Sequence, residues 1–171
     1  MNRIALAKLF ALSGAAICLG AIPGLADNPH CRHVGGGILT NFLDPSECLP
    51  TLGSSANLCT DGTATGDLKG AVGVQVDGIT GNVYHNRHHW VTESGDTMFL
   101  NPADLTIYST SDPNNRVLAD YTKGIEITGG TGAFAGAKGE LTSGFGAIDL
   151  NLLQITLHYA GTVCFSKVKE P

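Results

Sequence analysis

Apolar and polar residues alternate with a period of two through most of the chain after Thr60. This alternation is typical of strands with one buried face, and no stretch there keeps helical spacing over three turns. Turn-forming residues separate the alternating runs at short, regular intervals. The pattern predicts strands over residues 64–77, 83–93, 97–100, 104–110, 116–128, 138–149 and 152–164.

A meander of about eight such strands has two exposed edges unless it closes on itself. The sequence therefore predicts the all-β fold class and a closed eight-stranded antiparallel up-and-down β-barrel over residues 59–171. Residues 27–58 are rich in Gly, Pro, Asn and Asp and show little periodicity. We expect them to form an irregular N-terminal extension held by a disulfide.

The first 26 residues have the composition of a signal peptide. Arg3 and Lys8 flank an apolar run that reaches Ile22, and small residues precede a cleavage site after Ala26. The sequence thus predicts a secreted or periplasmic protein with no membrane span in the mature chain. Ten basic residues less these two leave eight against 15 acidic residues. The excess of negative charge argues against a nucleic-acid partner.

Four cysteines remain after cleavage: Cys31, Cys48, Cys59 and Cys164. An even number in an exported chain indicates two disulfides, with free buried thiols as the alternative. Three pairings are open. In a closed barrel the start of the first strand lies near the end of the last, which favours Cys59–Cys164 and leaves Cys31–Cys48. No spacing matches a zinc or redox motif.

Residues 128–136, TGGTGAFAG, contain the outline of a dinucleotide-binding fingerprint. That fingerprint needs a helix next, so that the helix N-terminus meets the pyrophosphate. Here a Gly-rich, strand-like run follows. The segment is therefore predicted to be a barrel corner, with Phe134 plugging the barrel end, and no cofactor is expected.

The pattern I-x-I-x-G-G-T-G-x-F-x-G-A-x-G over residues 125–139 resembles the signature of the allene oxide cyclase/dirigent-like barrels. The pattern H-x-W-x-T-x-x-G-D over 88–96 is similar to the strand and turn that precede it in bacterial members. The resemblance covers about residues 60–165 and implies an eight-stranded barrel with an apolar lumen. Plant members cyclise a fatty-acid epoxide or steer the coupling of phenoxy radicals, commonly as trimers. Their catalytic side chains lie outside these motifs, so no catalytic residue is carried over, and a homo-trimer is implied by resemblance alone.

Three histidines lie on one predicted strand. His85 and His89 share its more solvated face, about 13 Å apart at about 3.3 Å per residue, too far to bind one metal ion. His88 points to the opposite face, among aromatic residues. If that face is the lumen, His88 is a candidate general acid or base. The alternative is a hydrogen-bonded lumen histidine without chemistry.

The faces of the other strands complete the predicted lumen. The phase of residues 116–128 is ambiguous, because either phase places a charge inside; we favour Tyr121, Ile125 and Ile127 inward with Lys123 near the rim. On the last strand, Leu153, Ile155, Leu157 and Tyr159 form an apolar core face. The residues predicted to contact a ligand are Val72, Val74, Tyr84, His88, Trp90, Thr92, Phe99 and Tyr121.

Three functions fit such a barrel. The first is binding of a small apolar or aromatic molecule in the lumen. The second is a cyclase, isomerase or dirigent-type enzyme that preorganises a reactive intermediate. The third is a structural or interaction barrel with a packed lumen. An outer-membrane barrel is disfavoured, because Lys69, Gln75, Arg87 and Glu93 interrupt the outward faces.

Overall fold

The computed structural model describes residues 30–48 and 58–166. The predicted signal peptide, residues 1–26, and most of the segment between Cys48 and Cys59 lie outside the described residues. In the described part of the chain, no helix has the length and apolarity to cross a lipid bilayer.

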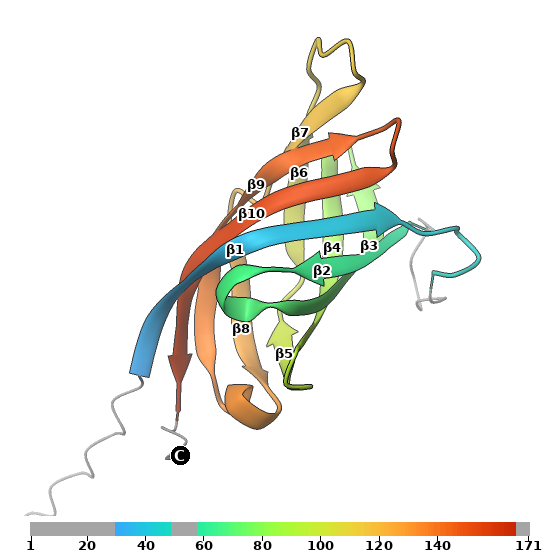
Figure 1. The fold of residues 1–171 in the computed structure, drawn as a ribbon. Helices are drawn as coiled ribbons and strands as arrows, with labels where there is room; N and C mark the ends of the chain where they lie inside the picture. Colours follow the sequence, from blue (N-terminus) through green and yellow to red (C-terminus); the bar gives the residue numbers. More distant parts are fainter. Residues whose placement is uncertain (1–29, 49–57, 167–171) are drawn as a thin grey trace, which may run out of the picture.

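The described residues are almost entirely strand, which confirms the all-β prediction (Figure 1). Two short 3-10 helices, η1 (Gly66–Leu68) and η2 (Gly132–Phe134), interrupt the strands. The strands are β1 (His30–Phe42), β2 (Cys59–Ala64), β3 (Gly70–Thr80), β4 (Val83–Thr92), β5 (Thr97–Leu100), β6 (Ala103–Tyr108), β7 (Arg116–Asp120), β8 (Ile125–Gly130), β9 (Lys138–Asp149) and β10 (Gln154–Phe165).

These strands close into the predicted antiparallel barrel with eight strand positions. Two positions are each filled by two consecutive short strands, β5 with β6 and β7 with β8. Strand β4 pairs with both β5 and β6, and β9 pairs with both β7 and β8. Strand β10 returns to β1 along a register from His30↔Phe165 to Asn41↔Gln154. Every strand among the described residues therefore has a neighbour on both sides.

The prediction of an irregular extension over 27–58 was wrong, because β1 lies within it. Its three consecutive glycines do not form a turn. They let the segment around η1 lie directly on the strand: Thr65 N–H donates to Gly37 O at 2.7 Å. A Cβ on Gly36 would lie 2.0 Å from Thr65 O. Glycine here serves a close backbone approach, which sequence periodicity does not distinguish from a loop.

The predicted disulfide pairing was also wrong. The bridges are Cys31–Cys164 and Cys48–Cys59. A disulfide does join the first and last strands, as the closure argument required. The first strand is β1, however, so the cysteine opposite Cys164 in register is Cys31. The second bridge spans the connection between β1 and β2. Two disulfides are typical of proteins that fold in an oxidising compartment.

Two predicted strands proved to be interrupted. The strand over 64–77 is split by η1 between β2 and β3. The strand over 116–128 is split by a turn at Tyr121–Gly124, where Gly124 has φ of 70°. The favoured phase was correct, because Tyr121, Ile125 and Ile127 are buried and Lys123 is exposed. In one continuous strand, either phase would have placed a charged residue inside. Because the turn interrupts the strand, Tyr121, Ile125 and Ile127 lie inside while Lys123 stays exposed.

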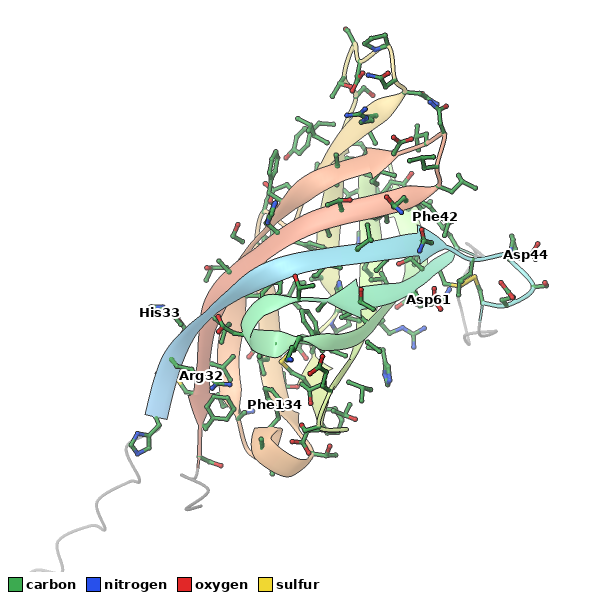
Figure 2. All side chains as sticks on the ribbon, in the orientation of Figure 1. Arg32, His33, Phe42, Asp44, Asp61 and Phe134 are labelled. Atoms are coloured by element: carbon green, nitrogen blue, oxygen red, sulfur yellow. A yellow bond between two sulfur atoms is a disulfide. The ribbon has the colours of Figure 1, made fainter. Side chains whose placement is uncertain are left out.

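One end of the barrel is filled with side chains. The Trp90 indole N–H donates to Leu68 O at 2.7 Å, and the Tyr159 hydroxyl donates to Thr65 O at 2.8 Å while accepting from Leu68 N–H at 2.9 Å. Phe134 of η2 is buried against Phe165, as expected for a plug at a barrel corner, and Figure 2 shows it at this end. No α-helix follows the Gly-rich segment, since β9 begins at Lys138.

The two disulfides are expected to differ in their contribution to stability. In the chain-entropy model, Cys31–Cys164, which spans 133 residues, contributes about 5 kcal/mol, and Cys48–Cys59, which spans 11, about 3 kcal/mol. Urea unfolding of Cys31→Ala/Cys164→Ala and of Cys48→Ala/Cys59→Ala should therefore show the larger loss in the first double variant. Peptide mapping without reduction is the control, and a Cys31–Cys48 linked peptide would contradict the structure.

Candidate ligand-binding cavity

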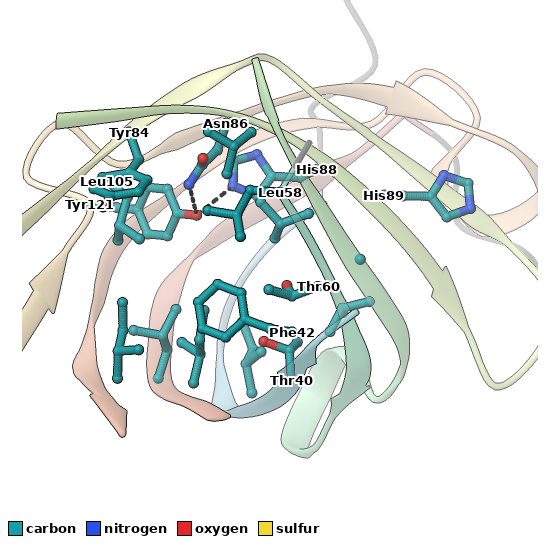
Figure 3. A pocket seen from close by; sticks show the side chains of 18 of the residues that line it. Thr40, Phe42, Leu58, Thr60, Tyr84, Asn86, His88, His89, Leu105 and Tyr121 are labelled. Atoms are coloured by element: carbon teal, nitrogen blue, oxygen red, sulfur yellow. Dashed lines mark hydrogen bonds between the residues drawn. The ribbon is translucent and has the colours of Figure 1, made fainter. Parts of the chain in front are cut away.

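The half of the barrel away from η1 and η2 encloses a cavity of about 490 Å³ (Figure 3). It extends from Trp90, above the filled end, to the opposite end of the barrel, where β1 ends and β9 turns into β10. Its walls are mainly aliphatic, with Val72, Ile125, Ile148 and Leu157 among them. None of the described lining residues is Asp, Glu, Lys or Arg.

The cavity reaches the surface at this far end. Leu150 and Leu153 both line it, and they are 41% and 55% exposed. The prediction that Leu153 belongs to the core face of the last strand was wrong. Leu153 has φ of 52° and belongs to the turn before β10, whereas Ile155, Leu157 and Tyr159 are buried as predicted. An apolar mouth therefore connects the lumen to solvent.

A group of three polar side chains lies in the cavity wall. Asn86 and His88 alternate inward from β4, and Tyr121 reaches them from the turn between β7 and β8. The Asn86 amide N–H donates to the Tyr121 hydroxyl oxygen at 2.9 Å, and that oxygen lies 2.8 Å from His88 Nε2. Gly144 makes room for the tyrosine, because a Cβ there would lie 2.9 Å from Tyr121 Cδ2.

Burial keeps this group uncharged at neutral pH. Desolvation lowers the pKa of His88 to about 4. Desolvation also raises the pKa of the Tyr121 hydroxyl, and the Asn86 hydrogen bond opposes this only in part. At pH 7 the imidazole is therefore neutral and the phenol protonated. His88 lies in the lumen as expected for the acid/base candidate, but its pKa is far from neutrality.

Three polar atoms in the cavity wall are buried and have no hydrogen-bond partner among the described residues: Thr60 Oγ1, Asn86 Oδ1 and His88 Nδ1. Buried polar atoms nearly always have partners, so three around one cavity are unusual. They mark this wall as the polar part of an otherwise apolar lumen.

Six of the eight residues predicted to contact a ligand do line the cavity: Val72, Val74, Tyr84, His88, Trp90 and Tyr121. Phe99 does not, and is 51% exposed. Met98 pairs with inward-facing Trp90, so Met98 points inward and its neighbour Phe99 outward. Thr92 lies at the closed end, where its hydroxyl donates to Asp96 O.

Other lining residues were missed. Asn86 shares the face of Tyr84 and His88 by simple alternation, so the period alone would have found it. Thr40, Phe42 and Thr60 come from β1 and β2, within or next to residues 27–58, which were predicted to be irregular.

The other two histidines of β4 do not belong to the Tyr121 group. On the outer face, His85 Nδ1 lies 2.7 Å from Asp104 Oδ1. The ring of His89 points away from the Tyr121 group (Figure 3).

Comparison with known proteins found no matching family model, no similar curated protein and no similar solved structure. The case for a function therefore depends on the cavity itself.

The Tyr121 hydroxyl is expected to stabilise the fold. Tyr121→Phe leaves the Asn86 amide and His88 Nε2 without their partner, and each buried polar group left unpaired costs about 1–3 kcal/mol. Urea unfolding should therefore show a loss of about 2–6 kcal/mol for the two groups together. Tyr108→Phe is the matched control, because Tyr108 is exposed on β6. Equal stability of the two variants would contradict the hydrogen-bonded arrangement.

His88 should make stability depend on pH. Its pKa is about 4 in the folded state and about 6.5 when unfolded, so the unfolded chain binds more protons between these values. The free energy of unfolding should fall as the pH drops through this window, by at most about 1.4 kcal/mol per pH unit from this residue. Unfolding of His88→Gln across the same window should show a shallower slope. If the free energy of unfolding had the same slope against pH in the wild type and in His88→Gln, this would contradict a neutral, buried His88.

Proposed function

We propose that this protein is a small secreted barrel that binds a small apolar or aromatic molecule in its lumen. The observation that carries the proposal is the cavity of about 490 Å³, which lies within the usual size range of small-molecule sites, roughly 300–1,000 Å³. Apolar walls, a few convergent polar groups and one open end are the usual features of such sites.

The cavity weighs against a barrel with a packed lumen. Trp90, Leu68 and Tyr159 fill only the end near η1, and the space beyond them is large compared with the packing gaps of a protein interior. A purely structural barrel would gain stability by filling this space with larger side chains. Retaining it is consistent with a ligand.

An enzyme of the cyclase, isomerase or dirigent type is the second candidate. The hydrogen bond between Tyr121 and His88 inside the cavity is the observation in its favour. General acid–base catalysis works best with pKa values near the operating pH. Burial moves the pKa of His88 down and that of Tyr121 up, away from neutrality. We therefore place binding before catalysis.

The relation to allene oxide cyclase/dirigent-like barrels belongs to the same proposal. Its support is the Gly-rich pattern over residues 125–139, which lies at a strand–corner–strand junction in a closed barrel of eight positions. The proposal of secretion is supported by the signal-peptide composition of residues 1–26 and by the two disulfides.

Filling the lumen should weaken binding. Ile155 faces the cavity, and its neighbour Thr156 faces outward on the same strand. We expect Ile155→Trp to weaken binding of the neutral fluorescent probe N-phenylnaphthylamine by about tenfold or more, equivalent to about 1.4 kcal/mol. Thr156→Trp is the matched control and should bind like the wild type.

Thermal melts of both variants check that the fold survives. Two folded variants with the same probe affinity as the wild type would place the probe outside the lumen and overturn the proposal.

A further inference from the structure

The Tyr121 hydroxyl has one hydrogen-bonding position that neither Asn86 nor His88 uses. A phenol oxygen accepts up to two hydrogen bonds and donates one. The Asn86 amide nitrogen has no lone pair to accept with, so at 2.9 Å it must be the donor. The contact to His88 Nε2 at 2.8 Å uses a second direction, and one donor or one acceptor position remains.

Which position remains depends on the tautomer of His88. If the imidazole proton is on Nδ1, Tyr121 donates to Nε2 and its second acceptor position stays free. If the proton is on Nε2, the imidazole donates to Tyr121 and the phenol hydrogen is free to donate elsewhere. The two arrangements offer opposite hydrogen-bonding character from the same oxygen.

The structure does not lock either tautomer. A histidine tautomer is normally set by the hydrogen bond at the other ring nitrogen. In the described residues, His88 Nδ1 is buried and has no such partner. The tautomer of His88 can therefore be set by the hydrogen-bonding group that a ligand presents to the Tyr121 hydroxyl.

We propose that the Tyr121 hydroxyl is the hydrogen-bonding point of the lumen, and that it selects uncharged ligands carrying a hydroxyl or ketone group on an apolar body. This inference rests on the proposed binding function. A ligand hydroxyl donates to the free acceptor position of Tyr121, and a ketone oxygen accepts the phenol hydrogen. In the ketone complex the imidazole holds its proton on Nε2, and in the hydroxyl complex on Nδ1, so it is neutral in both.

Ligands with an ionised group are excluded from this position. None of the described lining residues is Lys or Arg, and the ring of His89 points away from the Tyr121 group (Figure 3). Burying an unpaired carboxylate among apolar side chains is strongly unfavourable. The discrimination is therefore between neutral and charged oxygen groups on the same skeleton.

Competition against N-phenylnaphthylamine tests the selection with four molecules that share one rigid skeleton: fluorene, fluorenol, fluorenone and fluorene carboxylate. In the wild type, fluorene carboxylate should bind at least about tenfold more weakly than fluorenol. In Tyr121→Phe, the affinity of fluorenol and fluorenone relative to fluorene should fall by about tenfold. Tyr108→Phe is the matched control, because Tyr108 is exposed on β6 and is not among the residues that line the cavity, and it should keep the wild-type ratios.

The outcomes separate the two proposals. If none of the four molecules displaces the probe, both the binding function and this inference are overturned. If fluorene binds but Tyr121→Phe leaves the ratios unchanged, or Tyr108→Phe changes them as much as Tyr121→Phe does, only this inference is overturned.

A second measurement on the wild-type protein does not depend on a variant that folds poorly. Nitrogen-15 NMR of the labelled imidazoles, with His88 signals assigned through His88→Gln, reports which ring nitrogen holds the proton. With fluorenone bound, the proton of His88 should be on Nε2. A saturated fluorenone complex in which Nδ1 holds the proton would overturn the proposed contact between the phenol hydrogen and the ketone.

Discussion

Closure of the sheet by β1 and β10 is the constraint on which the rest of the molecule depends. The two strands pair along almost their whole length, and Cys31–Cys164 joins them where they begin and end. Without this seam the sheet would have two edges with unpaired backbone groups. The inward side chains would then line an open groove instead of a lumen enclosed by strands on all sides.

The closed barrel is filled at one end and hollow at the other. At the filled end, η1 and η2 supply Leu68 and Phe134, and hydrogen bonds join Trp90 and Tyr159 to the backbone of the η1 segment. At the hollow end, the break between β7 and β8 lets Tyr121 reach across to β4. The interruptions of the strands thus position both the plug and the polar group of the cavity.

Alternation of residues was enough to predict most of the strands after residue 60, although η1 and the turn before β8 interrupt two of them. It left the face of His88 conditional and that of Tyr121 a preference, and both side chains do line the lumen. It failed at β1, because glycines that allow close backbone packing resemble glycines of a loop. The wrong disulfide pairing followed from that error. The contact between Tyr121 and His88 was not predictable, since it depends on the turn after β7 and on the register of strands far apart in sequence. Asn86 was within reach of the same alternation and was overlooked.

Native mass spectrometry of the protein exported by its own host tests the central claim most directly, because it needs no prior choice of ligand. Our account predicts a barrel that carries one uncharged small molecule, which is released on unfolding and contains a hydroxyl or ketone group. A barrel that is empty in repeated preparations under gentle conditions would contradict it.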